Sequence, residues 1–370
     1  IERGRLVLRT LTPSRRTTIR LRACAGGACG GWVAVRTRTL GIPKGAALPR
    51  TVLGPLPPLG IMDSENAHTD AFAADAEELG LALVRVVVRW NEMQRDPRRI
   101  DFSSPHARRV DAAIRRALAD GRQVVITVDG PTPAFAIDPT QPGRAPRLDA
   151  WRAYVLALAR RYRRVLWWET WNEPNAAGAF SLYPYRQLQL ASVLRRTVRR
   201  LNPDAQVLLA LGSGRRTPFG PARQLAYWRD YVRFAADYGV VLPAFDAISF
   251  HPYNRDLGVG LLPQHPNGSN LYESGDVGRL LAAIDEAFPG EDMPLAITEF
   301  GHLTGPTPRI GAGLTPEGQA DALCGTLSEL RRWNRTGRIL MAIWYLSRDE
   351  RDPERAWTSG LRYADGTPKP

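Results

Sequence analysis

Two glutamates stand where apolar runs of the sequence end. Glu173 lies in the stretch Trp171-Asn172-Glu173-Pro174, which follows an apolar run at residues 165–168, and Glu299 directly follows the run at 295–298. Charge at the end of a buried strand requires a partner or a task. One such glutamate alone more often caps a helix or pairs with an arginine. Two together could perform glycoside hydrolysis, in which a protonated carboxyl group donates to the departing oxygen and an ionised carboxylate attacks the anomeric carbon.

The elements that must position these residues alternate along the chain from residue 59 onward. Short apolar runs are separated by amphipathic stretches of helical length, and we expect strands at 59–62, 83–88, 123–128, 165–168, 206–211, 247–250, 295–298 and 339–344. Continuous apolar strands that alternate with helices are typical of a parallel sheet covered by helices. Eight such units predict an α/β fold, a (β/α)8 TIM barrel, over residues 59–370. A doubly wound sheet is the alternative, but no Gly-x-Gly-x-x-Gly follows the first run.

The catalytic groups of such a barrel lie at the C-terminal ends of its strands. The residues directly after each run are therefore the candidates for chemistry. The fourth and seventh predicted strands face one another across the barrel mouth, so their glutamates can approach to about 5 Å, the separation of the carboxyl groups in a retaining glycosidase.

Residues 1–58 differ from the rest of the chain. In residues 1–40, stretches at 5–8, 18–22 and 32–38 alternate in the manner of strands, which predicts a β-rich segment or a small β-module. Residues 41–58 carry five prolines and few polar side chains, which indicates a semi-rigid linker. Cys24 and Cys29 enclose two glycines, and we expect a disulfide between them, with two free thiols as the alternative. A disulfide points to a secreted or extracellular protein.

The chain is strongly basic. Its formal net charge is +13, and of its 50 basic residues only Lys44 and Lys369 are lysine. Such an excess first suggests a nucleic acid or a membrane surface as partner. The arginines, however, fall in pairs in the predicted helices or at their ends, where they form the solvated outer shell of a barrel. We therefore expect no nucleic-acid partner, and no apolar stretch is long enough to span a membrane.

The strand-end motifs together resemble clan A of the glycoside hydrolases. In these barrel enzymes the fourth strand ends in Asn-Glu-Pro and the seventh in Thr-Glu-Phe/Tyr-Gly, which match Asn172-Glu173-Pro174 and Thr298-Glu299-Phe300-Gly301. The resemblance implies that Glu173 is the acid/base, that Glu299 is the nucleophile and that Asn172 binds the sugar's 2-hydroxyl group. Family 39 is the most similar and family 5 the next, because the third run continues into Asp129-Gly130 without the histidine usual in family 5.

Other positions fit the same resemblance. Arg85, in the second run, matches an inward arginine that steadies the nucleophile and would keep it ionised. His251 and Tyr253 match a His-x-Tyr motif after the sixth strand, which implies that Tyr253 reaches the nucleophile and His251 the substrate. Trp344, in the last run, matches the tryptophan that forms the floor of the sugar pocket, where an aromatic face suits the apolar side of a pyranose.

Two further tryptophans are expected to touch the sugar. Trp171 precedes the Asn-Glu-Pro motif, with the barrel core as the alternative, and Trp90 follows the second run. The dispersed histidines do not suggest a metal site, and we expect no cofactor. The predicted function is a retaining glycoside hydrolase that cleaves β-linked glycosides or polysaccharides and acts as a monomer. A transglycosylase with the same residues and a non-catalytic carbohydrate-binding barrel are the alternatives.

Overall fold

The computed structural model describes residues 16–21, 24–25, 28–29, 33–38 and 54–370, except for 142, 176–183, 215–219, 234, 239, 255, 267–271, 308–312 and 353–356. The chain divides into two compact units, Ile1–Val52 and Leu53–Pro370. In the first unit, β1 (Arg16–Leu21) pairs antiparallel with β4 (Val33–Arg38), and β2 (Cys24–Ala25) pairs antiparallel with β3 (Ala28–Cys29). The strand expected at 5–8 lies outside the described residues.

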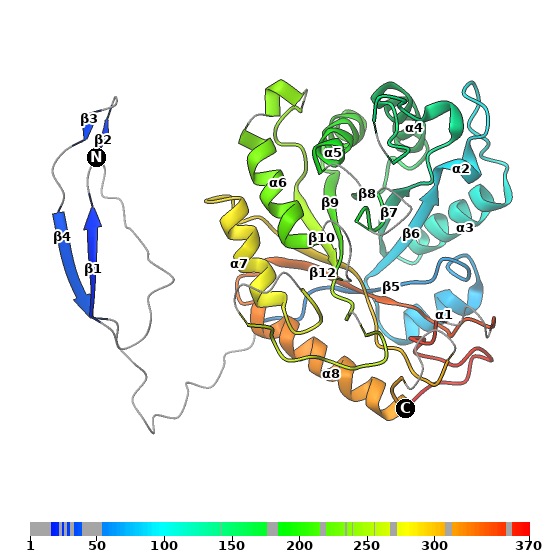
Figure 1. The fold of residues 1–370 in the computed structure, drawn as a ribbon. Coiled ribbons are helices and arrows are strands. Elements are labelled where there is room, and N and C mark those ends of the chain that lie inside the picture. Colours follow the sequence, from blue (N-terminus) through cyan, green and yellow to red (C-terminus); the bar gives the residue numbers. More distant parts are fainter. Residues whose placement is uncertain are drawn as a thin grey trace. The chain divides into compact units, whose positions relative to one another are not determined.

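Eight parallel strands of the second unit close into a barrel (Figure 1). In ring order they are β5 (Leu59–Met62), β6 (Leu83–Arg89), β7 (Gln123–Asp129), β8 (Trp167–Thr170), β9 (Gln206–Ser213), β10 (Ala247–His251), β11 (Leu295–Phe300) and β12 (Ile339–Tyr345). Each strand pairs in parallel with its neighbours, and β12 pairs with β5 to close the ring. The predicted TIM-barrel fold is confirmed, although β8 begins at Trp167 instead of Val165.

Helices cover the outside of the barrel (Figure 1). They are α1 (Asp70–Glu78), α2 (Trp90–Met93), α3 (Pro105–Ala119), α4 (Leu148–Arg161), α5 (Pro184–Arg199), α6 (Pro221–Arg233), α7 (Val277–Ala287) and α8 (Pro316–Trp333), with 3-10 turns at Ala134–Ala136 and Ala235–Tyr238. Local sequence sets where they begin. The Ser104 hydroxyl accepts the N–H of Ala107, and Pro105 occupies the first turn of α3. Thr69 caps α1 in the same way.

Side chains on each strand alternate between the barrel interior and the surrounding helices. On β12, Met341 and Ile343 belong to the inner apolar cluster, whereas Ala342 and Trp344 belong to the cluster between the strands and the helices. The inner cluster consists of Met62, Leu83, Val125, Leu208, Ala247, Ala296, Met341 and Ile343. These apolar side chains fill the lower part of the barrel, and the buried charges of Arg85 and Glu169 pair with each other above them.

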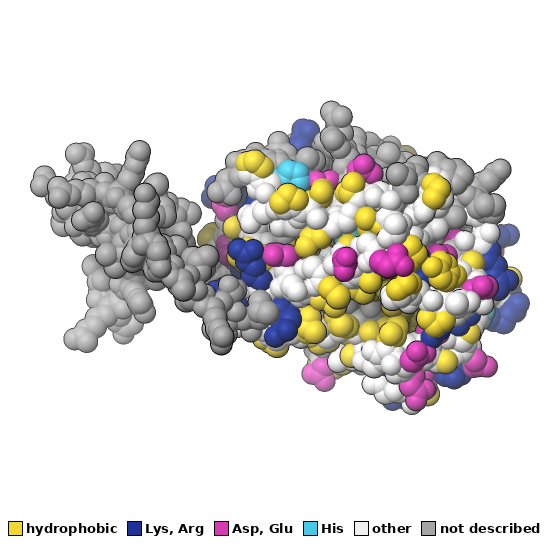
Figure 2. Space-filling view, turned by 90° about the horizontal axis from the view of Figure 1, so that it is seen from below, with side chains coloured by type: hydrophobic (Ala, Val, Ile, Leu, Met, Phe, Trp, Pro, Cys, Tyr) yellow, Lys and Arg dark blue, Asp and Glu magenta, His cyan; other side chains and the backbone are white. Residues whose placement is uncertain are grey.

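Several arginines of the outer helices are paired with carboxylates. Arg195 and Arg199 of α5 both bind Asp246, at 2.9 and 3.0 Å, and Arg161 of α4 binds Asp111. On the face shown in Figure 2, the described basic side chains lie in separate groups near the margin, and acidic side chains lie between them. Such interspersed charge is typical of a solvated surface.

The segment after β12 takes the place that a last helix would occupy and runs next to α1 (Figure 1). Arg348 and Arg362 of this segment bind the buried carboxylate of Asp75 on α1. The ammonium group of Lys369, near the end of the segment, lies 2.9 Å from the carboxylate of Asp349, near its start. Among the described residues, no helix is long and apolar enough to cross a membrane.

Candidate active site

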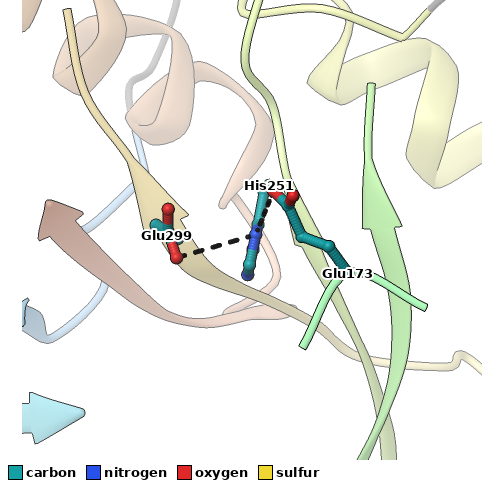
Figure 3. A group of neighbouring side chains, drawn as sticks. All are labelled: Glu173, His251 and Glu299. Atoms are coloured by element: carbon teal, nitrogen blue, oxygen red, sulfur yellow. Dashed lines mark hydrogen bonds and ion pairs between the residues drawn. The ribbon is translucent and has the colours of Figure 1, made fainter. Parts of the chain in front are cut away.

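Glu173 and Glu299 face each other across the barrel mouth, with His251 between them (Figure 3). Glu173 follows β8, Glu299 lies in β11, and His251 ends β10. Nδ1 of His251 is 2.9 Å from Oε1 of Glu173 and 3.8 Å from Oε2 of Glu299. One carboxylate oxygen of Glu173 lies within 4.8 Å of one oxygen of Glu299. This fits the separation of about 5–5.5 Å between the carboxyl groups of retaining glycosidases.

Arg85 of β6 is fully buried below the two glutamates and donates to three polar side chains at once. Its Nε lies 2.9 Å from Glu169 Oε2, its Nη1 2.9 Å from Glu299 Oε2, and its Nη2 2.8 Å from Asn172 Oδ1. Burial alone would lower the pKa of Arg85, but the carboxylates of Glu169 and Glu299 raise it above its usual value. The guanidinium therefore stays charged and ties the nucleophile candidate to the loop that carries Asn172.

Glu299 receives a hydrogen bond at each carboxylate oxygen. Arg85 donates to Oε2, and the hydroxyl of Tyr253 donates to Oε1 at 3.0 Å. Burial and the neighbouring charge of Glu299 raise the pKa of Tyr253 well above its usual value, so the phenol remains a neutral donor. Donors at both oxygens stabilise the ionised form of Glu299, which is the form that a nucleophile needs.

A tight turn after β8 presents Asn172 and Glu173 to the cleft. Trp171 (φ 69°) and Glu173 (φ 40°) have left-handed backbones, which residues other than glycine rarely adopt. The side chain of Asn175 fastens the far end of the turn to β9, because it exchanges hydrogen bonds of 2.9 and 3.1 Å with the backbone of Ser213. The turn thus stores strain where the chemistry is expected.

Asp129, at the end of β7, supports the same turn. Its Oδ1 accepts the backbone N–H of Asn172 at 3.2 Å. Burial raises the pKa of Asp129 to about 6, against the opposing effect of its backbone hydrogen bonds and of Arg85.

Because Arg85 is only a donor, Oδ1 of Asn172 must face it, which leaves the Nδ2 group as a donor for a sugar hydroxyl.

The two glutamates open into a cleft of about 250 Å³. Its lining residues come from most of the barrel strands and the loops that follow them: Met62, Ser64, Val87, Arg89, Asp129, Asn172, Glu173, Tyr253, Glu299, Tyr345, Glu350 and Trp357. The aromatic part of the lining is one connected group, since Trp357 lies 5.4 Å from the ring of Tyr253 and 5.5 Å from that of Tyr345. The cleft therefore combines an aromatic wall with charged and amide groups, as sugar binding requires.

The expectation that Trp90 and Trp171 touch the sugar is wrong, because both side chains lie in the core outside the barrel strands. Trp90 is 0% exposed, stacks on Tyr154 at 4.7 Å and donates to Gln94. Trp171 is 1% exposed and lies against Gly130, where a Cβ atom would come within 2.4 Å of the indole. For Trp171 this is the alternative interpretation, and Trp90 belongs to the same core.

The assignment of Trp344 to the pocket floor is also wrong. Its indole packs edge to face on Phe300 at 5.2 Å and donates to the backbone oxygen of Ser359. Strand alternation explains the correction: Met341 and Ile343 face inward, so the inward residue at the end of β12 is Tyr345. Tyr345 lines the cleft in place of Trp344.

Several residues of the site were not predicted. Glu169 is fully buried and accepts hydrogen bonds from Arg85, Thr127 and Thr298. The sequence could have indicated Glu169, because it lies two residues after Trp167 and therefore faces the barrel interior as Trp167 does. A carboxylate in that position must have partners. Asp129 and Tyr345 are the last residues of β7 and β12, each one position beyond the predicted apolar run, and Trp357 lies in the segment after β12; none of the three was assigned to the cleft. Glu173, Glu299, Asn172, Arg85, His251 and Tyr253 do come together.

The cluster of Glu173, His251 and Glu299 has a spacing that a metal ion could also use, since one ligand atom of each lies within 4.8 Å of the others. Both oxygens of Glu299 already accept hydrogen bonds from Arg85 and Tyr253, and Nδ1 of His251 already contacts Glu173. These groups are thus occupied by one another, and we assign no metal to them.

The corrected aromatic wall makes a prediction. Replacing Trp357 with alanine is expected to raise KM for a β-glycoside about tenfold with little change in kcat, because a stacking surface binds substrate and transition state alike. Trp90→Phe is the matched control: it should lower the melting temperature and leave KM unchanged, since Trp90 lies in the core. Initial rates at several substrate concentrations measure both. A KM effect of Trp90→Phe alone would restore the original assignment.

This fold and this carboxylate pair define a barrel glycosidase of clan A. The family model for cellulase, glycosyl hydrolase family 5, matches residues 57–312. The chain belongs to this family, and it is a glycoside hydrolase. The sequence matches no curated protein significantly.

Solved structures with the same fold include a member of family 39, the family that the motifs placed first. A family 39 glycoside hydrolase from Bacteroides cellulosilyticus WH2 has a TM-score of 0.62 and 20% identity, over 97% of this chain and 69% of that chain. A monomeric beta-xylosidase from Caulobacter crescentus CB15 has a TM-score of 0.57 and 21% identity, over 86% and 68%. Beta-glucosidase from Thermotoga maritima has a TM-score of 0.56 and 13% identity, over 86% and 94%. The resemblance to clan A is confirmed, while the matching family model is that of family 5, which the motifs placed second.

Proposed function

We propose that this glycoside hydrolase cleaves β-linked glycosides with retention of configuration, with Glu173 as the acid/base and Glu299 as the nucleophile. The observation that carries the proposal is the contrast between the two carboxyl groups. Arg85 and Tyr253 donate to Glu299 at 2.9 and 3.0 Å, whereas Glu173 contacts His251, whose Nδ1 can accept a proton. One carboxyl group is thus held ionised and the other can hold a proton.

The residues divide the reaction between them. Glu173 gives its proton to the glycosidic oxygen while a carboxylate oxygen of Glu299 attacks C1, which breaks the C1–O bond and forms a glycosyl ester on Glu299. Glu173, now ionised, takes a proton from water, and the hydroxide oxygen attacks C1 and displaces Glu299. Nδ2 of Asn172 donates to the 2-hydroxyl group, an interaction that strengthens in the transition state.

The substrate class can be tested with the protein as it stands. We expect hydrolysis of aryl β-glycosides and none of the matching α-glycosides, because a base above one face of the sugar and a nucleophile below the other serve one configuration at C1. A panel of nitrophenyl β- and α-glycosides, including xylosides and glucosides, followed by chromatography of products from β-linked polysaccharides, measures this. Exclusive cleavage of α-glycosides would contradict the proposal.

The protein is further proposed to be secreted, with a disulfide between Cys24 and Cys29. Antiparallel pairing of β2 with β3 puts these two cysteines directly opposite each other, which supports the disulfide. Without reductant, a peptide containing both cysteines should resist alkylation and gain two alkyl groups after reduction, as measured by mass spectrometry. Alkylation of both thiols without reduction would contradict the pairing.

The same preparation should run as a monomer in size-exclusion chromatography with light scattering.

A further inference from the structure

Glu169 and Thr298 connect the interior of the barrel to His251 through a buried chain of hydrogen bonds. The hydroxyl of Thr298 on β11 lies 2.6 Å from Oε1 of Glu169 on β8. The same hydroxyl lies 3.2 Å from Nε2 of His251, and the other ring nitrogen, Nδ1, is 2.9 Å from Oε1 of Glu173. Four side chains from three strands and one loop are thus connected in a line that ends at the acid/base.

Glu169 is ionised in this arrangement. Its Oε2 lies 2.7 Å from a guanidinium nitrogen of Arg85 and accepts the hydroxyl of Thr127 at 2.6 Å. Burial alone would raise the pKa of Glu169, but the charge of Arg85, with a further effect of His251 and of hydroxyl donors, lowers it to about 2. Because that pKa lies below the range in which an enzyme of this kind operates, the carboxylate has no proton to donate and can only accept.

The donor at each step follows from this. The hydroxyl of Thr298 has one proton, and Glu169 takes it, so the oxygen can only accept from His251. Nε2 of His251 must therefore carry a proton. Its neutral form then has a lone pair at Nδ1, which points to Glu173.

We propose that Glu169 and Thr298 are positioning residues that fix the tautomer of His251, so that the catalytic proton of Glu173 is held between Oε1 and Nδ1. A lone pair at Nδ1 and an ionised carboxylate are both acceptors, so their contact of 2.9 Å is a hydrogen bond only while one proton lies between them. The pair thus retains the proton that the leaving group needs. This inference rests on the proposed role of Glu173 and adds the residues that act through His251.

The charged groups around His251 are consistent with a single shared proton. Glu299 Oε2 lies 3.8 Å from Nδ1, Glu169 lies beyond Thr298, and Arg85 binds both of these carboxylates. The phenol of Tyr253, two residues along the chain, is a neutral donor to Glu299 and not to the imidazole. Arg85 and hydroxyl donors therefore satisfy both of these carboxylates. The remaining proton lies between Nδ1 of His251 and Glu173.

The tautomer can be measured in the wild-type protein. The chain has five histidines, so ¹⁵N-histidine labelling gives a small set of ring resonances, and the pair that disappears in His251→Asn identifies His251. We expect Nε2 to be protonated at every pH at which the enzyme is active. An unprotonated Nε2 in this range would overturn the proposal. This readout does not require turnover, so it stands even if the proposed substrate class fails.

Variants of the threonines test the consequence for catalysis. Thr298→Val removes the acceptor of Nε2, which lets the proton move to Nδ1 and favours ionised Glu173. The basic limb of the kcat/KM profile should then shift to lower pH by about one unit, the effect of one hydrogen bond. The shift should appear with an alkyl β-glycoside, which needs protonation, and be absent with a dinitrophenyl β-glycoside, which does not.

Two further variants separate positioning from a loss of packing. Thr298→Ser keeps the hydroxyl and should return the basic limb to its wild-type position. Thr127→Val removes a hydroxyl that donates to Glu169 at the same distance, 2.6 Å, without touching His251, and should leave the basic limb in place. A Thr298→Val profile that matches wild type, or an equal shift in Thr127→Val, would show that the path does not set the proton of Glu173.

Discussion

Replacing Glu299 with glutamine is expected to lower kcat on an aryl β-glycoside on the order of 10⁴-fold or more, because no glycosyl ester can form on an amide. The substitution keeps the size of the side chain. The amide oxygen can still accept from Arg85, which lies 2.9 Å from Oε2 in the wild type, so the loss reports chemistry more than folding. Stopped assays with a nitrophenyl β-glycoside measure the change, and the melting temperature shows that the variant folds.

A matched control for this variant is Glu77→Gln, which makes the same chemical change at an exposed position of α1. It should keep wild-type kcat and KM, because Glu77 does not line the cleft. If Glu299→Gln retained near-wild-type turnover while folding normally, the nucleophile would have to be another residue of the cleft.

Removing the side chain of Glu173 is expected to have a large effect that depends on the leaving group. Glu173→Ala should lose about 10²–10⁴-fold in rate on an alkyl β-glycoside, where general acid catalysis is needed. From a dinitrophenyl β-glycoside the dinitrophenolate leaves without being protonated, so the glycosyl ester on Glu299 should still form. The ester should then persist, because no base activates water. Burst kinetics with this substrate measure the accumulation of the ester.

Adding azide gives a second test of the Glu173→Ala variant. It needs no base, so it should enter the space vacated by Glu173, release the sugar as the β-glycosyl azide and raise the rate on the dinitrophenyl substrate. Glu299→Gln is the control and should show no such rescue. An equal loss on both substrates, with no azide product, would remove Glu173 from the acid/base role.

Transglycosylation remains a competing fate for the same glycosyl ester. Water and a second sugar would both be activated by ionised Glu173, so the catalytic residues do not distinguish the two outcomes. Chromatography of products with and without added acceptor sugar separates them: a free reducing sugar indicates hydrolysis, and longer glycosides indicate transfer.

The barrel and the two glutamates could be predicted because both are local in the sequence. Each strand is a continuous apolar run, and each glutamate directly follows or closes such a run. The tryptophans were harder, since a pattern match to Trp344 competed with the alternation of side chains along β12. Counting inward positions from Met341 would have selected Tyr345. The same count from Arg85 on β6 puts Trp90 on the outer side, where the structure has it.

The buried layer beneath the glutamates could not be found from local patterns. Glu169 contacts Thr127, Arg85 and Thr298, which are 42, 84 and 129 residues away in the sequence. Only the closure of the barrel brings these side chains together, so their hydrogen bonds appear in no window of the sequence. Trp357 was missed for a related reason, because the segment after β12 returns to the cleft instead of forming a helix.

The most direct test of the paired glutamates is the configuration of the sugar at the moment of release. A barrel that uses Glu299 as nucleophile and Glu173 as acid/base displaces twice at C1 and returns the original configuration. Proton NMR of a β-glycoside digested by the wild-type enzyme should therefore show the β-anomer first, followed by the α-anomer as the free sugar equilibrates in water. If the α-anomer formed first, the reaction would be a single displacement by water, and Glu299 would not be its nucleophile.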